Sequence, residues 1–439
     1  MKKIILFYPK TDHEKNYLYY WIPYSLLTIA SGCIDSRYDI LLIDENASSI
    51  DEYWNTITND IDSIICIGIS CMTGHQIENG IDFAKSIRKL NENIPIIWGG
   101  PHPTLFPKET LHNEYVDYVI QGQGELRLPL LIEHIISNKE KPYHLEGIGE
   151  KVDEKMYLNK GHVMADKKDF PPFPWHLLDL SKYIKSDNDI NTRTLNYISS
   201  QGCPFHCGFC SEVALYSGKW TSFNVDRVIA DIRYLVNTYE LNGIKFYDAN
   251  LFGKKRHALE IAKQLIPLDI QWAASGHPAT LSTLTDDEWD LLKESGCKRL
   301  LIGLESGSQE VLDSIHKNFD IRKAISLAEK LRDHGMIGSF TFIVGFPNRV
   351  DKYEVEKTLE LAKSIRSVSD KHECKIHFYA PYPGTPLWED AIRQGFVGPD
   401  QLEDWASFDY YCIETPWMPK SLEAQIHLFN KESCPYVHL

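Results

Sequence analysis

The chain has 439 residues, which is enough for two domains, each with its own hydrophobic core. Hydrophobic residues make up 43% and charged residues 24%, as in ordinary globular proteins. The formal net charge of −15 disfavours a nucleic acid partner, because an acidic surface repels phosphate groups. No apolar run is long enough for a membrane span, and no secretory signal is recognisable. Ten cysteines without such a signal lead us to expect a cytoplasmic protein whose thiols are free or bind metal.

Residues 1–138 alternate between strand-like and helix-like patterns. Residues 63–70 are apolar almost without interruption, as in a strand that is buried on both faces. The alternation predicts a doubly wound α/β domain, in which helices cover both faces of a parallel sheet. Ligands of such sheets bind beyond the carboxyl ends of the strands. The strands expected here are residues 3–8, 39–44, 63–70, 95–98 and 118–120.

The rest of the chain divides into three parts. Residues 139–193 are polar, lose the periodicity and include a stiff proline-rich stretch, which predicts a linker. Residues 194–387 resume the alternation with six strand–helix units, too few for an eight-stranded barrel. Residues 388–439 are rich in aromatic side chains, and we expect a C-terminal extension on the substrate side. The strands expected in residues 194–387 are 195–200, 243–248, 270–275, 298–304, 338–344 and 374–380.

Three cysteines lie close together in the segment 200–210, at spacings of four and three residues: Cys203, Cys207 and Cys210. Thiolates are soft ligands, and three of them on one loop can bind three irons of a 4Fe–4S cluster. The fourth iron then keeps an open position, where a substrate or cofactor can bind. The residues alone leave two alternatives open, a zinc site completed by His206 and free thiols.

The CxxxCxxC spacing, with Phe209 before the third cysteine, resembles the signature of the radical S-adenosylmethionine (SAM) enzymes. In that family the open iron chelates the amino and carboxylate groups of SAM, and reduction of SAM yields a 5′-deoxyadenosyl radical. The resemblance implies that the three cysteines hold the cluster and that Phe209 lies at the cofactor. It also implies a partial (β/α)6 barrel for residues 194–387 and an external electron donor such as flavodoxin or ferredoxin.

Four segments at expected strand ends match the large branch of this superfamily that contains cobalamin enzymes. They are residues 246–252, 301–308, 342–347 and 377–387. In such barrels the chemistry gathers at the carboxyl ends of the strands. The resemblance therefore implies SAM contacts from these segments, with Glu305 at the ribose or the amino end of SAM. The further cofactor contacts expected are Asn250, Ser306, Val344, Gly345 and Tyr379.

Two polar residues at strand ends are candidates for catalytic groups. Asp248 is a candidate to hydrogen-bond SAM or the substrate, and the alternative is an ordinary loop aspartate. His277 stands where relatives often have arginine, and its imidazole can donate or accept a proton near neutral pH. The alternative for His277 is a hydrogen-bonded loop histidine, and the alternative for Glu305 is a helix cap.

Glycines mark the ends of two strands expected in residues 1–138. Residues 70–74 follow one of these strands and residues 99–103 the other, and glycine lets a bulky ligand approach the backbone closely. The pattern resembles the serine and glycine part of the cobalamin-binding fold, and residues 122–125 match cobalamin-binding radical SAM proteins. The cobalamin contacts that the resemblance implies are Ser70, Met72, Thr73, Gly99, Gly100, Gly122 and Glu125.

One part of the cobalamin-binding pattern is missing. The DxHxxG segment, whose histidine ligates cobalt in the best-known members, is replaced by residues 22–28, which have no Asp, His or Gly. Many members of the radical SAM branch bind cobalamin without a protein histidine, so the loss fits the resemblance. The alternative is a doubly wound domain without a cofactor, whose glycines only turn the chain.

Together, these resemblances imply an oxygen-sensitive, cobalamin-dependent C-methyltransferase. The deoxyadenosyl radical takes a hydrogen atom from an unactivated carbon, methylcobalamin gives the substrate radical a methyl group, and a second SAM remethylates the cobalamin. We expect the substrate to be a small metabolite or a natural-product intermediate. Three alternatives stay open. They are a non-methylating radical SAM dehydratase, epimerase, cyclase or rearrangement enzyme with a vestigial cobalamin domain, a non-enzymatic cobalamin or redox sensor, and a zinc-binding regulatory protein.

Overall fold

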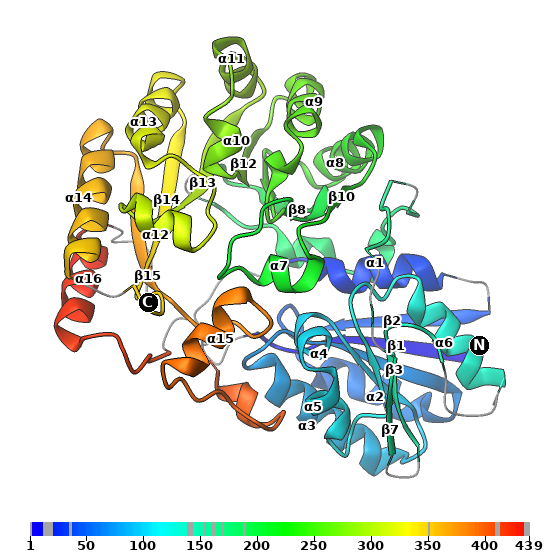
Figure 1. The fold of residues 1–439 in the computed structure, drawn as a ribbon. Helices are drawn as coiled ribbons and strands as arrows, with labels where there is room; N and C mark the ends of the chain where they lie inside the picture. The colour runs from blue at the N-terminus through cyan, green and yellow to red at the C-terminus, as the bar shows by residue number, and fades with distance from the viewer. Residues whose placement is uncertain are drawn as a thin grey trace. The chain divides into compact units, whose positions relative to one another are not determined.

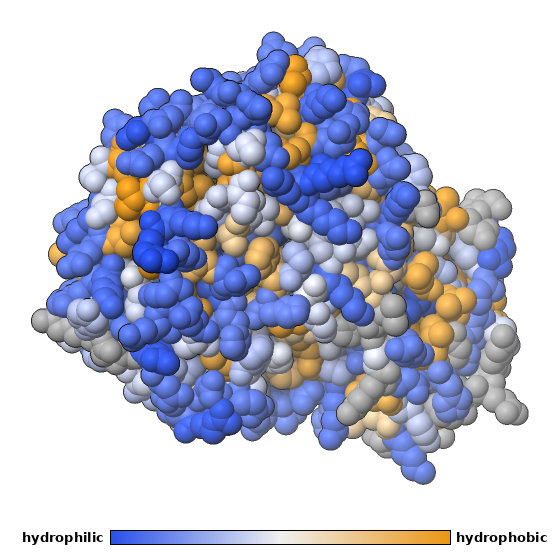
Figure 2. Space-filling model, turned by 45° about the horizontal axis from the view of Figure 1, so that its top comes forward, coloured by the Kyte–Doolittle hydropathy of each residue, from blue (hydrophilic) through white to orange (hydrophobic). Residues whose placement is uncertain are grey.

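The computed structural model describes most of the chain, namely residues 2–11, 21–34, 37–137, 144–152, 155–159, 161, 164–168, 170–187, 190–349, 352–408 and 413–433. The chain forms two units, whose elements are labelled in Figure 1. The first comprises Met1–Tyr183 and Pro399–Asp409, and the second comprises Ile184–Gly398 and Tyr410–Leu439. None of the described helices has both the length and the apolar character needed to cross a membrane. The face shown in Figure 2 is mostly hydrophilic, with smaller hydrophobic groups between.

A seven-stranded sheet forms the centre of the first unit, with the strand order β2-β1-β3-β4-β5-β6-β7. Its strands are β1 (Lys2–Tyr8), β2 (Tyr38–Asp44), β3 (Ile64–Ser70), β4 (Ile96–Gly99), β5 (Tyr118–Ile120), β6 (Ile148–Val152) and β7 (Lys155–Leu158). Its helices are α1 (Tyr24–Cys33), α2 (Asp51–Asn59), α3 (Gln76–Leu90), α4 (Pro101–Leu105), α5 (Pro107–His112) and α6 (Arg127–Ser137).

Strands β1 to β5 of this sheet are parallel, and helices lie on both of its faces. In Figure 1, α1 and α6 lie on one face, and α2 and α3 lie on the other. Consecutive residues of β1 are therefore buried, from Ile4 through Phe7, because neither face of the strand meets water. This arrangement confirms the predicted doubly wound α/β class.

The segment predicted as a linker, residues 139–193, supplies strands β6 and β7. They pair antiparallel with each other, and β6 pairs antiparallel with β5. Strand β7 has only four residues and none of them is fully buried, so it lacks the run of buried apolar residues by which a strand is recognised in a sequence. The boundaries 1–138, 139–193, 194–387 and 388–439 stay predictions.

A six-stranded parallel sheet forms the centre of the second unit, with the strand order β15-β14-β13-β12-β11-β8. Its strands are β8 (Thr194–Tyr197), β11 (Gly243–Phe246), β12 (Gln271–Ser275), β13 (Cys297–Glu305), β14 (Ile337–Val344) and β15 (Glu373–Phe378). The helices that follow these strands are α8 (Val225–Tyr239), α9 (Lys255–Leu265), α11 (Asp286–Glu294), α13 (Ala324–Asp333) and α14 (Lys352–Val368). A short hairpin of β9 (Ser200–Gly202) and β10 (Trp220–Ser222) stands apart from the sheet.

The strands of this sheet follow one another in chain order, which confirms the predicted partial barrel of six strand–helix units. Figure 1 shows α8, α9, α11, α13 and α14 along the outer face of the sheet. Alternate residues of β14, such as Phe340 and Phe342, are fully buried, whereas Thr341 and Ile343 between them are partly exposed. The inner face is less covered, and Leu301 of β13 is 44% exposed there. An open inner face leaves room for cofactors and a substrate.

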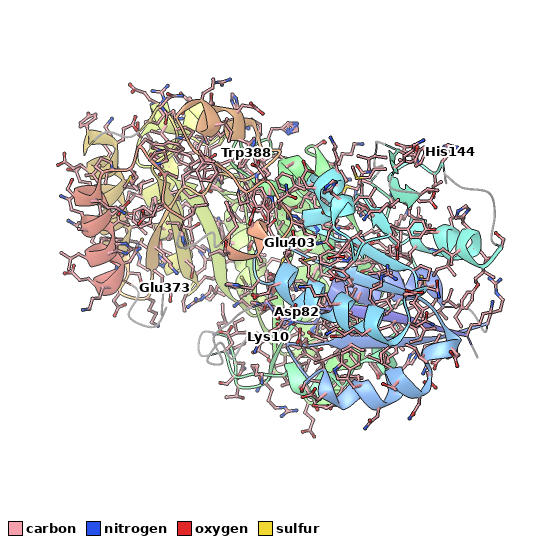
Figure 3. All side chains as sticks on the ribbon, turned by 90° about the horizontal axis from the view of Figure 1, so that it is seen from below. Lys10, Asp82, His144, Glu373, Trp388 and Glu403 are labelled. Carbon is pink, nitrogen blue, oxygen red and sulfur yellow. The ribbon has the colours of Figure 1, made fainter. Side chains whose placement is uncertain are left out.

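The predicted C-terminal extension, residues 388–439, is divided between the two units. Its residues 399–408 belong to the first unit, where Trp405 is buried with its ring 4.5 Å from that of Phe106. Glu403, labelled in Figure 3, accepts a hydrogen bond from the Asn113 amide. The helix α15 (Pro386–Arg393) and the helix α16 (Lys420–Ser433) belong to the second unit.

Helix α16 covers the end strand β15 through one side chain. The Asn430 carbonyl oxygen accepts a hydrogen bond from the Ile376 backbone N–H at 2.9 Å, and the Asn430 amide donates to the Ile376 carbonyl at 2.7 Å. The amide thus takes the place of a neighbouring strand. The exposed edge of a sheet otherwise invites pairing with another chain, so Asn430 both stabilises and closes this edge.

Replacing Asn430 with Ala should lower the free energy of unfolding by about 2 kcal/mol, because two buried backbone groups of Ile376 lose their partners. Urea denaturation followed by circular dichroism measures this loss. Lys431→Ala, at the next and exposed position of α16, is the matched control and should cost far less. Equal costs for the two variants would show that the Asn430 amide does not hold the edge.

Candidate active site

The cysteine loop, residues 203–210, connects strand β9 to helix α7 (Ser211–Tyr216). Two backbone hydrogen bonds fix its centre: Gly208 N–H donates to Ile315 at 2.7 Å, and Leu387 N–H donates to the Gly208 carbonyl at 3.0 Å. A Cβ on Gly208 would lie only 3.5 Å from Ile315 O and from the Leu387 side chain, so the loop approaches these segments closely. The loop is therefore held by residues that follow β13 and β15, far away in sequence.

The three thiols of the loop are close enough to influence one another. Burial raises the pKa of Cys207 to about 11 and that of Cys210 to about 12, and the neighbouring thiols contribute to both shifts. Thiols with such pKa values must lose their protons to bind iron, so a metal has to compensate for the burial.

The geometry of the loop fits a cluster better than a single ion. Among the residues that the structure describes, no group of three or more His, Cys, Asp or Glu side chains is arranged to hold one metal ion. A zinc site of three cysteines and a histidine needs four donors that converge on one point. In a 4Fe–4S cluster each cysteine binds a different iron, so the sulfurs need not converge. The donor set of Cys203, Cys207 and Cys210 therefore fits the cluster.

A buried lysine stands next to the thiols. Lys317 Nζ lies 2.7 Å from Glu305 Oε1, and both side chains are buried. Burial lowers the pKa of Lys317, but attraction to Glu305 and to the thiols of Cys207 and Cys210 outweighs this effect and raises it. Lys317 thus remains an ammonium, which lowers the pKa of Cys207 and favours its thiolate.

The backbone at the end of β13 makes this ion pair possible. Glu305 has a φ of +69°, and the pairing of β13 with β14 shifts between Gly303 and Glu305. A Cβ on Gly303 would collide with the Glu305 carboxylate, so glycine at this position leaves the carboxylate space to fold back towards Lys317. Lys317 was not predicted as a site residue, because nothing in the sequence links it to a glutamate twelve residues earlier. The predicted contact of Glu305 with SAM stays a prediction.

Asn250 joins the loop to the neighbouring strand ends. Its amide donates to Cys203 Sγ at 3.5 Å, its carbonyl oxygen accepts from His277 N–H at 3.3 Å, and its backbone carbonyl accepts from the Trp220 indole at 3.3 Å. The predicted cofactor residue Asn250 therefore contacts Cys203, a predicted cluster ligand, directly. Hydrogen bonds to cluster sulfurs are among the interactions that set the potential of such clusters.

His277 occupies the cap position of the short helix α10 (Pro278–Leu281). Its Nδ1 accepts a hydrogen bond from Ala279 N–H at 3.2 Å, so the ring hydrogen is on Nε2. The ring stacks on Phe205 with centroids 3.5 Å apart. Burial and the Lys317 ammonium lower the pKa of His277 to about 2, so the imidazole is neutral. These contacts favour the interpretation of His277 as a hydrogen-bonded loop histidine. The catalytic role of His277 stays a prediction.

The turn after β14 touches the cysteine loop and the C-terminal segment. Phe346 is buried between Phe209 of the loop, at 5.6 Å between ring centroids, and Tyr379, at 5.4 Å. Gly345 has a φ of +84°, and its carbonyl accepts a hydrogen bond from the Trp417 indole at 2.9 Å. Val344 and Ser306 are also buried close to these strand ends. Their predicted contacts with SAM stay predictions.

In the first unit, the residues predicted for cobalamin gather at the carboxyl ends of β3, β4 and β5. Ser70 of β3 and Gly99 of β4 are direct partners in the sheet. A Cβ on Gly100 would lie 2.9 Å from the backbone of Cys71, so the fold itself requires this glycine. A Cβ on Gly99 would meet nothing closer than 3.8 Å, so packing does not require Gly99. Ligands of parallel sheets bind beyond such strand ends, where Gly99 lies, so the predicted contact of Gly99 with cobalamin stays a prediction.

The other predicted cobalamin residues differ in their surroundings. Met72 is 38% exposed beside this edge, and Thr73 hydrogen-bonds the buried His102 ring at 3.0 Å. Gly122 has a φ of +68° and donates its N–H to Thr104. Glu125 forms a buried ion pair of 2.7 Å with Lys167, so this carboxylate holds the chain around residue 167 in place.

Comparison with known proteins extends this picture to the whole chain. The family model of the radical SAM superfamily matches residues 197–362, and the model of the B12 binding domain matches residues 15–132. The chain is 29% identical over 385 residues to an uncharacterized methyltransferase of Pyrococcus horikoshii, covering 85% of this chain and 79% of the relative. It is 26% identical over 398 residues to the cytidylyl-2-hydroxyethylphosphonate methyltransferase of Streptomyces wedmorensis, covering 83% and 74%.

Solved structures share the fold of the chain. The methyltransferase TsrM of Kitasatospora setae, with cobalamin and a 4Fe–4S cluster bound, aligns with a TM-score of 0.72 at 14% identity, covering 90% of this chain and 78% of TsrM. The cobalamin-dependent enzyme OxsB, with aqua-cobalamin and SAM bound, aligns with a TM-score of 0.71 at 16% identity, covering 100% of this chain and 62% of OxsB.

The chain therefore has a B12-binding domain, in residues 15–132, ahead of a radical SAM domain, in residues 197–362. It is a cobalamin-dependent radical SAM enzyme whose cofactors are a 4Fe–4S cluster, SAM and cobalamin. The predictions of an enzyme and of these three cofactors are confirmed.

Replacing Cys207 with Ala should abolish both the cluster and the cleavage of SAM, because two thiolates cannot hold the cube in place. Iron content after anaerobic reconstitution and 5′-deoxyadenosine formation measure the two losses. Cys297→Ala is the matched control, since Cys297 is equally buried but lies within β13, and it should keep both properties. Full SAM cleavage by Cys207→Ala would contradict the assignment of the ligands.

Replacing Gly99 with Leu should prevent cobalamin binding, because the longer side chain fills the room at the end of β4. The corrinoid absorption should disappear after desalting while the absorption of the cluster remains. Gly99→Ala adds only a Cβ that fits and should retain more of the corrinoid. Wild-type cobalamin content in Gly99→Leu would place the ligand elsewhere.

Proposed function

We propose that this enzyme transfers a methyl group to an unactivated carbon of a small metabolite or natural-product intermediate. The observation that carries the proposal is the combination, in one chain, of a radical SAM domain that contains the three-cysteine loop with a B12-binding domain. Several relatives that match most of this chain are named as methyltransferases, among them those of Pyrococcus horikoshii and Streptomyces wedmorensis.

The residues of the second unit have four tasks in this proposal. Cys203, Cys207 and Cys210 hold three irons and leave the fourth open for SAM. Lys317, kept charged by Glu305, compensates the negative charge of the thiolates. Phe346 and its neighbours shape the turn where SAM lies. The buried surroundings exclude water from the reacting groups.

In the first unit, Ser70, Met72, Thr73, Gly99, Gly100, Gly122 and Glu125 are the residues proposed to surround cobalamin. The strand ends provide backbone groups, and residues 22–28, which stand in place of the DxHxxG segment, contain no histidine to ligate cobalt. When bound, the cluster, SAM and cobalamin supply the one-electron and methyl-transfer chemistry. The protein supplies their orientation.

The redox partner in this proposal is a small electron-transfer protein such as flavodoxin or ferredoxin. Reduction of the cluster needs one electron at low potential, and no such donor is part of the chain's two matched domains. The ten cysteines and the cluster also require a reducing compartment, which supports a cytoplasmic enzyme.

A second candidate function is radical chemistry without methyl transfer. Its support is a relative of comparable coverage, the anaerobic magnesium-protoporphyrin IX monomethyl ester cyclase of Synechocystis, which is 24% identical over 389 residues, covering 87% of this chain and 75% of the relative. In that case the cobalamin would serve another purpose, and no methyl group would leave SAM.

The fate of SAM separates the two candidates without knowledge of the substrate. A methyltransferase converts SAM to S-adenosylhomocysteine when it methylates the reduced corrinoid, and to 5′-deoxyadenosine when it forms the radical. We expect the enzyme, reconstituted with cluster and cobalamin and reduced with flavodoxin, to produce both, and S-adenosylhomocysteine only with cobalamin present. Liquid chromatography with mass spectrometry measures both products. Release of 5′-deoxyadenosine alone would favour the second candidate and overturn the first.

A further inference from the structure

The carboxylate of Asp248, predicted above as catalytic, is occupied by the chain segment that leads into the cysteine loop. Asp248 lies two residues after the end of strand β11 and is almost completely buried. Its Oδ1 accepts hydrogen bonds from the hydroxyl of Ser199 at 2.8 Å and from the hydroxyl of Ser200. The backbone N–H of Ser199 lies 3.1 Å from Oδ2 and 3.2 Å from Oδ1.

These contacts leave Asp248 little capacity for another ligand. A carboxylate offers about four lone-pair sites, and Ser199 and Ser200 supply three donors between them. Ser199 and Ser200 are themselves buried, at 0% and 1% exposure, so the carboxylate faces protein on the side where they lie. A buried carboxylate is costly unless donors surround it, and here Ser199 and Ser200 of this one segment supply the donors.

The position of Ser199 and Ser200 in the chain gives these hydrogen bonds their significance. Ser200 begins strand β9, and Cys203 follows that strand directly. The path of the chain from β8 into the cysteine loop is therefore set at a point only a few residues before the first cluster cysteine. Because β11 is the neighbour of β8 in the sheet, a side chain at its end is well placed to hold this path.

The same strand end holds the loop at a second point. Asn250, two residues after Asp248, donates to Cys203 Sγ at 3.5 Å. The end of β11 thus contacts the loop both before its first cysteine and at that cysteine. Residues that hold metal ligands in place commonly act from such neighbouring positions.

We propose that Asp248 is a positioning residue, which fixes the direction of the chain entering the cysteine loop through Ser199 and Ser200, and that it does not contact the substrate. The proposal rests on the assignment of Cys203, Cys207 and Cys210 as cluster ligands. It does not depend on methyl transfer, so either candidate function is compatible with it.

The test compares variants of the full-length protein after anaerobic reconstitution with iron and sulfide alone. In Asp248→Asn an amide hydrogen would face the Ser199 N–H, and in Ser200→Ala one donor is lost. Both variants should weaken retention of the cluster about 10-fold or more and alter the electron paramagnetic resonance spectrum of the reduced cluster. The double variant should be no worse than the more affected single one, because both act through the same contact.

A matched control separates positioning from stability. Asp231 is another buried aspartate of the second unit, and it accepts a hydrogen bond from the Tyr197 hydroxyl at 2.9 Å. Asp231→Asn should lower the melting temperature but leave the cluster content per folded chain and the resonance spectrum unchanged.

Two outcomes would overturn the proposal. If Asp248→Asn keeps the wild-type cluster, spectrum and SAM affinity but loses product formation, Asp248 is a catalytic residue. If Asp248→Asn behaves like Asp231→Asn, with lower stability and an unchanged cluster, Asp248 is only structural. Failure of the proposed methyl transfer would appear in the SAM products instead, so the two failures are distinguishable.

Discussion

The site depends on one mechanical constraint: a loop of eight residues has to hold three thiols at fixed positions while leaving one iron open. Such a loop cannot do so alone, since it has few internal hydrogen bonds. Gly208 is instead fixed to Ile315 and Leu387, and Asn250 fixes Cys203. The parallel strands of the second unit bring these distant segments to one edge. The position of the cysteine loop therefore depends on the fold of the whole second unit, and no single residue fixes it.

The thiols of the cysteine loop also need an electrostatic environment that favours their deprotonated form. Burial alone disfavours thiolates, as the raised pKa values of Cys207 and Cys210 demonstrate. The Lys317 ammonium offsets part of this cost, and its own burial is offset by the Glu305 carboxylate. Glu305 reaches Lys317 only because Gly303 leaves it space. At the start of β15, away from these strand ends, Glu373 (Figure 3) pairs with Arg299 at 3.0 Å.

Some of this could be predicted from the sequence and some could not. Strand–helix alternation is periodic, so the fold class could be predicted from the sequence. The spacing of Cys203, Cys207 and Cys210 is a local pattern, and its resemblance to the radical SAM signature implied the cluster and SAM. The contact between Asp248 and Ser199 spans 49 residues and depends on strand order, which no local pattern encodes. The ion pair of Lys317 with Glu305 depends on the positive φ of Glu305 and on a shift in the pairing of β13 with β14, neither of which is visible in the sequence. Strand β7 is short and has no fully buried residue.

The most direct test of the account is the absorption spectrum of the protein after anaerobic reconstitution with iron, sulfide and hydroxocobalamin, followed by desalting. The account predicts that one chain retains both chromophores, the cluster held by Cys203, Cys207 and Cys210 and the corrinoid held at the ends of β3, β4 and β5. Retention of the cluster without the corrinoid would contradict the role assigned to the first unit. Loss of both would contradict the assignment of the cysteine loop.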